Sequence, residues 1–209
     1  MPLERPVDPA EAMRPALALL ELDSIAAGID AGDAMAKRAA VETLLAGTVH
    51  PGKYLVLVAG DVAAVEESFA AGEDRGAGHI VDRVILRDVH PGVVAALTGT
   101  RLGDDVEALG VLETASVAAT VEAADAGLKG ARVILLEMRL ADGLGGKGYL
   151  LFGGTVSAVE AAVEIGAGRI APDAAVAVRV IPRLDPRMRE NLAAEPRFGH
   201  RVRGTAWEG

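Results

Sequence analysis

The chain has 209 residues with a formal net charge of −9, and its residues are 51% hydrophobic but only 3% aromatic. The negative charge argues against a nucleic-acid partner, because contact with phosphates requires clustered Lys and Arg. The absence of cysteine excludes disulfides, thiolate zinc sites and conventional iron–sulfur clusters.

Residues 1–15 form a charged, proline-rich lead-in without an apolar core, which is unlike a secretory signal peptide. No later segment reaches the roughly 18 apolar residues that span a bilayer. We therefore expect a soluble cytoplasmic protein without a membrane partner.

The pattern of apolar residues then predicts strands and helices in alternation. The expected elements are a strand over 16–22, a helix capped by Ser24 and ending near Arg38, a hairpin with strands over 41–49 and 53–59, a helix with Val62, Val65 and Phe69 on its apolar stripe, a strand over 80–86 and a short helix over 91–97. Together they describe one small domain.

This pattern occurs twice in the chain. Ala16–Leu44 and Ala108–Leu136 are identical at 14 of 29 positions. After two inserted residues, Gly52–Gly72 and Gly146–Gly166 are identical at 9 of 21. Agreement in both order and spacing indicates the tandem duplication of a unit of about 90 residues.

The duplication predicts an α+β protein with two tandem domains, each a small, mostly antiparallel sheet with helices gathered on one face. The expected divisions are a lead-in over 1–15, a first domain over 16–97, a linker over 98–107, a second domain over 108–194 and a tail over 195–209. We predict no function for the tail.

One segment, residues 47–53, matches the phosphate-binding pattern G-x-x-x-x-G-K. However, Tyr54 replaces the Ser or Thr that would hold magnesium, and a strand is expected to follow instead of a helix. A tight hairpin turn is therefore the better interpretation, and we expect no cofactor.

The ionisable residues form no catalytic or metal-binding pattern. The histidines are His50, His79, His90 and His200. Their spacing fits neither a metal triad nor a Ser-His-Asp arrangement, so exposed loop histidines are favoured. Glu21 and Glu113 each lie in an apolar strand, where a carboxylate that accepts backbone or hydroxyl hydrogen bonds is favoured over a general acid.

Four short motifs occur in the same order in both copies. They are Leu19-Leu20-Glu21 and Val111-Leu112-Glu113-Thr114 at strand ends, Asp33–Lys37 and Asp125–Lys129 on Ala-rich helices, Gly60–Val65 and the segment 154–159, and the strand ends Ile85-Leu86-Arg87 and Ile181-Pro182-Arg183. In this combination the chain resembles the bacterial microcompartment shell proteins, whose domain is ferredoxin-like. Because the strand with Glu21 comes first, it resembles the unpermuted tandem type.

The resemblance implies a structural protein and not an enzyme. Three chains would form a pseudohexameric tile, and tiles would pack edge to edge in the shell of a microcompartment, beside hexameric and pentameric shell proteins. Small polar metabolites would cross a central pore lined by His50, Pro51, Gly52, Leu144, Gly145 and Gly146. The lattice edge would carry Lys37, Arg87, Lys129 and Arg183.

Simpler or different interpretations stay open. The pairs Asp33–Lys37 and Asp125–Lys129 also fit surface ion pairs one helical turn apart. A trimeric small-molecule sensor of duplicated ferredoxin-like domains is the alternative function, and an enzyme with its site between the domains is the least favoured.

For the pore that the resemblance implies, we expect a mildly electropositive character, which would come from His50 and from the backbone N–H groups of the loop glycines.

Overall fold

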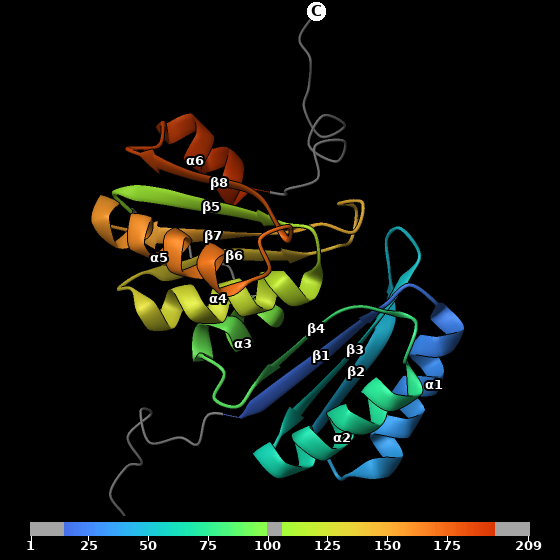
Figure 1. The fold of residues 1–209 in the computed structure, drawn as a ribbon. Helices are drawn as coiled ribbons and strands as arrows, with labels where there is room; N and C mark the ends of the chain where they lie inside the picture. The colour runs from blue at the N-terminus through green and yellow to red at the C-terminus, as the bar shows by residue number, and fades with distance from the viewer. Residues whose placement is uncertain (1–14, 100–105, 195–209) are drawn as a thin grey trace, which may run out of the picture.

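The computed structural model describes residues 15–99 and 106–194, which fold into two units of the same architecture (Figure 1). The predicted lead-in, most of the linker and the tail lie outside these residues. Each unit is a four-stranded antiparallel sheet with two long helices on one face. The predicted α+β fold with two tandem domains is confirmed.

The first unit follows the predicted order of elements. Its bounds are β1 Ala16–Leu22, α1 Ile25–Arg38, β2 Thr43–Val49, β3 Lys53–Gly60, α2 Val62–Arg75, β4 Ile80–Leu86 and α3 Pro91–Leu97. The strands lie in the order β2-β3-β1-β4. Strand β2 starts two residues later than expected.

The second unit repeats this arrangement. Its bounds are β5 Ala108–Thr114, α4 Val117–Gly130, β6 Ile134–Leu140, β7 Gly148–Gly154, α5 Val156–Arg169, β8 Ala175–Pro182 and α6 Pro186–Ala193. The order β6-β7-β5-β8 is that of the first sheet. The two inserted residues lie in the β6–β7 loop, between Ala141 and Lys147.

The helices begin where polar side chains can cap them. The Ser24 hydroxyl accepts the Ala27 N–H, and the Ser116 hydroxyl accepts the Ala119 N–H. Each cap satisfies one of the backbone donors that a helix start leaves without an intrahelical partner. The predicted cap at Ser24 is therefore confirmed, and the second copy reproduces it.

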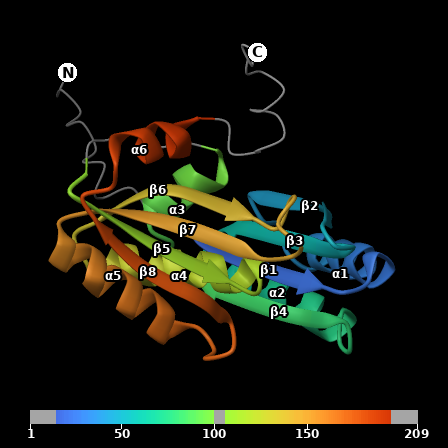
Figure 2. The same cartoon turned by 90° about the horizontal axis from the view of Figure 1, so that it is seen from above.

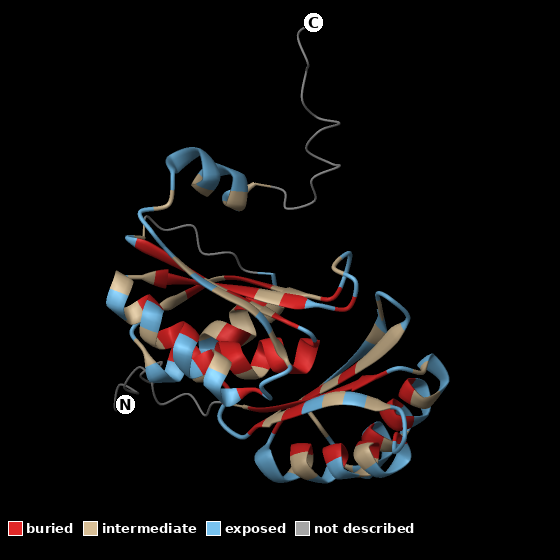
Figure 3. Ribbon diagram, turned by 45° about the horizontal axis from the view of Figure 1, so that its top comes forward, coloured by how far each residue is buried: buried red, intermediate tan, exposed pale blue. Residues whose placement is uncertain are grey.

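Strand β1 is buried along its whole length because both of its faces are covered (Figure 3). Alternate side chains point to opposite faces of a sheet. Leu20 and Leu22 therefore pack with Met35 of α1, whereas Leu17 and Leu19 belong to a cluster shared with the second unit. The two units are joined by a common apolar core.

The strand pairing corrects one equivalence between the copies. Leu17 of β1 pairs with Leu86, and the matching Leu109 of β5 pairs with Ile181. Arg87 therefore corresponds to Pro182 and not to Arg183. The two Ile-x-Arg strings are similar in sequence but differ by one residue in sheet register, which a comparison of short strings cannot detect.

Candidate assembly interface and pore loops

The β2–β3 and β6–β7 hairpin loops lie side by side (Figure 1). The His50 Nδ1 atom is 3.7 Å from Asp142 Oδ1, and both side chains are largely exposed. A Cβ added to Gly146 would come within 3.0 Å of Pro51. The structure thus brings the predicted pore residues of the two copies together.

Glycine is required in these loops by the backbone itself. Gly52 has φ of 109° and Gly146 has φ of 89°, a region that L side chains rarely adopt. These turns therefore stay narrow, and a hairpin turn is confirmed at residues 47–53 because strand β3 follows directly. Asp142 was missed in the sequence, although it occupies the loop position that corresponds to His50.

A buried carboxylate joins the first unit to a helix of the second. Glu21 is fully buried, and its Oε2 accepts the Val117 N–H at 2.8 Å, at the first turn of α4. Its Oε1 accepts a hydrogen bond from Lys53 Nζ at 2.6 Å. A negative charge at a helix N-terminus is favoured by the exposed backbone donors and the helix dipole.

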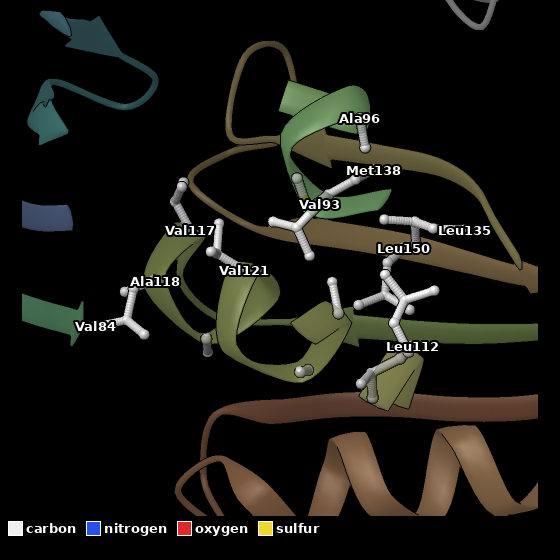
Figure 4. Packing of buried hydrophobic residues seen from close by; sticks show 14 of the residues in the cluster. Val84, Val93, Ala96, Leu112, Val117, Ala118, Val121, Leu135, Met138 and Leu150 are labelled. Carbon is white, nitrogen blue, oxygen red and sulfur yellow. The ribbon is translucent and has the colours of Figure 1, made fainter. Parts of the chain in front are cut away.

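Sequence reasoning anticipated that Glu21 accepts backbone hydrogen bonds but not that the donors belong to the other unit. The Ser116 hydroxyl, which caps α4, also donates to Asp82 of β4 across the same boundary. The outer face of β1 and β4 is packed against α4, with Val84 beside Ala118 (Figure 4). We call this set of contacts the internal junction.

Helix α3 completes the internal junction. It leaves the first sheet after β4 and lies against α4 and β6 of the second unit, where Val93 is fully buried (Figure 4). The His90 N–H, at the start of α3, donates to Asp125 Oδ1 at 2.8 Å. Asp125 is also paired with Lys129 at 2.6 Å.

The predicted pairs one helical turn apart are confirmed in both copies, at Asp33–Lys37 and Asp125–Lys129. Their surroundings differ, because the Asp125 side chain is 6% exposed and the Asp33 side chain is 54% exposed. Of these two aspartates, it is Asp125 that also accepts a hydrogen bond from the His90 N–H at the start of α3.

The four predicted edge residues lie at the ends of the sheets that are remote from the hairpin loops. Lys37 and Lys129 are near the ends of α1 and α4, about 20 Å of helix away from the loop side of each unit. Arg87 follows β4 and pairs with Glu66 at 2.5 Å, and Arg183 follows β8. Their role at a tile edge remains a prediction.

One carboxyl near the internal junction has an altered pKa. Burial raises the pKa of Glu122 on α4, and the charges of Asp82 and Asp125 act in the same direction. Arg169, whose Nε lies 3.1 Å from Glu122, opposes the shift.

Within residues 15–99 and 106–194, no group of three or more His, Asp or Glu side chains is arranged to hold a metal ion. Over the same residues, no helix is both long and apolar enough to cross a membrane.

Comparison with known proteins identifies both units. The BMC domain family matches residues 16–89 and 108–184. The bacterial microcompartment shell protein PduT of Citrobacter freundii is 42% identical over 153 residues, which cover 73% of this chain and 83% of PduT. The shell protein EutK of Salmonella typhimurium is 42% identical over 72 residues, 34% of this chain and 43% of EutK.

Solved structures agree with this result. A crystal structure of a microcompartment protein from Desulfitobacterium hafniense matches with a TM-score of 0.74 and 39% identity, over 85% of this chain and 99% of that one. A fused permuted hexameric shell protein from the RMM microcompartment matches with a TM-score of 0.53 over 74% of this chain and 84% of its own. At 19% identity, the second match shows a common fold alone.

Proposed function

Because this chain belongs to the bacterial microcompartment shell proteins and carries their BMC domain twice, we propose that three copies form a flat tile with six similar units around a central pore. The internal junction carries this proposal. It is a head-to-tail contact, in which one surface of the first unit meets a different surface of the second. Repetition of such a contact closes a ring when the rotation permits.

The hairpin loops would line the pore of this tile. His50 and Asp142 would alternate around the axis, so the Asp142 carboxylates would offset the mildly electropositive character expected from His50 and the backbone N–H groups of the loop glycines. Small polar metabolites suit such an opening, because glycine N–H groups and carboxylates offer donors and acceptors.

Lys37, Arg87, Lys129 and Arg183 would face neighbouring tiles at the rim. The tile would pack beside hexameric and pentameric shell proteins in the wall of a microcompartment within the bacterial cytoplasm. The protein would act as a structural barrier and not as an enzyme, in keeping with its shell-protein relatives.

Two measurements test the proposal. Native mass spectrometry should find three times the chain mass of 21.4 kDa, about 64 kDa. Negative-stain microscopy should show hexagonal particles or ordered layers. A monomer or dimer at micromolar concentration would overturn the tile.

A ligand-binding sensor is the second candidate. It is favoured by an apolar cavity of about 520 Å³ on the outer face of the first sheet, lined by side chains that include Leu17, Leu57 and Leu97. A saturable rise in Tm with a small ligand, in the absence of ordered layers, would favour the sensor over the tile.

A further inference from the structure

We infer that the outer face of the first sheet is a docking groove for residues 1–14 of the same chain. The groove and the segment belong to one chain, so the inference goes beyond the proposed trimer and does not depend on it. The two repeats differ at this face, because a helix covers it in the second repeat and leaves it open in the first.

The groove is the apolar cavity of about 520 Å³ on the outer face of β1, β3 and β2. Leu17 and Leu57 line it, and Leu45 of the edge strand β2 is 62% exposed beside them. Another wall is formed by Val94 and Leu97 of α3. Apolar side chains gathered around an open cavity favour an apolar occupant that removes them from water.

The corresponding face of the second sheet is covered by α6, which lies on the side opposite α4 and α5 (Figure 2). Leu109 and Leu151, the counterparts of Leu17 and Leu57, line a gap of only about 60 Å³ against this helix. The second repeat thus shows that a short helical segment can cover this face of the domain.

Helix α3 does not cover the first sheet, although it follows β4 as α6 follows β8. It is held on the second unit, where Val93 is fully buried and the His90 N–H donates to Asp125. Helix α3 therefore borders the groove without filling it. A cover for the first sheet must then come from another segment.

The lead-in over residues 1–14 is the segment in reach. Pro15, the residue before β1, already lines the groove, so the lead-in joins the described chain at its edge. Seven extended residues span about 23 Å, which is the length of a strand such as β1. The lead-in is therefore long enough to turn back along the whole groove.

Charge favours the same arrangement. Glu42 is the one ionisable side chain among the described residues that line the groove. It lies beside the start of β1, because its backbone nitrogen would be 3.0 Å from a Cβ at Gly60, the residue that pairs with Ala16. Arg14 precedes Ala16 by two residues and would meet Glu42 there.

The sequence of the lead-in repeats the start of α6. Helix α6 begins with Leu184-Asp185-Pro186, and the Asp185 carboxylate accepts the Arg187 N–H as a cap. The lead-in contains Val7-Asp8-Pro9, which again places an aspartate before a proline. Aspartate at the cap and proline at the first helical position both favour the start of a helix.

The spacing of apolar residues also agrees. Leu184 and Leu192 line the gap between α6 and the second sheet. Val7 and Pro15 have the same spacing, and Pro15 lines the groove of the first sheet. Val7 is therefore the side chain that would enter the groove beside Leu45.

Disulfide trapping tests the docking, because the chain has no cysteine to interfere. Val7→Cys/Leu45→Cys should form an intrachain disulfide under mild oxidation, seen as a faster band on a non-reducing gel. The control Val7→Cys/Val62→Cys uses an exposed residue at the start of α2, on the opposite face of the sheet. Val62 follows Gly60, which pairs with Ala16, so a lead-in without a preferred position would reach it at least as readily as Leu45. The control should cross-link several times more slowly.

Equal rates in the two double variants would overturn the docking. A mixture of the single variants Val7→Cys and Leu45→Cys should give no more covalent dimer than a mixture of Val7→Cys and Val62→Cys. An excess of dimer would place the lead-in on a neighbouring chain and overturn the assignment to the same chain. Circular dichroism checks that each variant is folded.

The apolar dye 1-anilinonaphthalene-8-sulfonate gives a second measurement, because a docked lead-in fills the cavity that would otherwise take a small ligand. Val7→Asp should withdraw the lead-in, since a carboxylate is costly to bury among leucines, and dye binding should rise several-fold. Adding Leu45→Asp should remove this gain, which assigns it to the groove. Dye binding that Val7→Asp leaves unchanged would overturn the inference.

Discussion

The Glu21 carboxylate and the Lys53 ammonium form a 2.6 Å ion pair at the start of a helix that belongs to the other repeat. Glu21 thereby connects three elements: its own strand β1, the β2–β3 hairpin through Lys53, and α4. Because this carboxylate is fully buried, its removal would leave Lys53 and the α4 backbone donors without their partner.

The first prediction compares the two equivalent glutamates. Glu21→Ala should lower the free energy of unfolding by about 3 kcal/mol, the usual cost of breaking a buried ion pair. Glu113→Ala should cost much less, because the Glu113 side chain is one-third exposed and its pair with Lys147 is screened by solvent. Urea unfolding of both variants checks this difference, and an equal loss of unfolding free energy from the two substitutions would contradict it.

The second prediction concerns the tile edge. Lys37→Ala combined with Lys129→Gln should leave trimers intact but abolish sheets or tubes, because the lysines lie at the ends of α1 and α4 remote from the hairpin loops. Glutamine is chosen at position 129 because its amide can still donate a hydrogen bond to the buried Asp125, which pairs with Lys129 at 2.6 Å. Electron microscopy detects the sheets or tubes, and light scattering measures the mass of the trimer. Normal sheets from a folded double variant would place the edge elsewhere.

The third prediction concerns transport through the pore. Asp142→Asn should speed the entry of an anionic reporter into reconstituted shells, because it removes a negative charge from the proposed pore. His50→Glu should slow the same reporter, because it adds a negative charge at a position 3.7 Å from Asp142. A neutral reporter of the same size should be nearly unaffected by either change. Equal effects on both reporters would remove these residues from the path.

The fourth prediction concerns the dependence of stability on pH. Since burial raises the pKa of Glu122, its ionised form disfavours folding at neutral pH. As the pH falls through this raised pKa, the folded protein binds the proton first, and the unfavourable contribution disappears by about pH 4. Glu122→Gln should therefore be more stable than the original chain at pH 7 and equal to it near pH 4. A constant difference across this range, measured by urea unfolding, would refute the assignment.

Much of the fold could be predicted because the chain supplies two versions of each element. The apolar stripe of the long helix is clearer in α4 than in α1, and the repeat transfers the assignment from one to the other. The register of β4 and β8 could not be predicted in this way. It depends on which residues pair with Leu17 and Leu109, and the short strings around Arg87 and Arg183 align equally well one residue apart.

The site was predictable only where its residues are local in sequence. The turn at His50-Pro51-Gly52 and the pairs Asp33–Lys37 and Asp125–Lys129 follow from spacing alone. The contact from Glu21 to Val117 joins residues 96 positions apart, and no local pattern encodes it. The available signal was the buried acid itself, which must find a donor somewhere in the fold.

The course of the chain also bears on how the proposed tile would respond to mechanical load. Strand β4 leads into α3, and α3 already lies on the second unit before β5 begins. Two kinds of contact between neighbouring units would therefore alternate around the ring: three within a chain, which the peptide backbone crosses, and three between chains, which are noncovalent alone. A tile under strain would separate at the contacts between chains. The products would be whole chains that can enter a new ring.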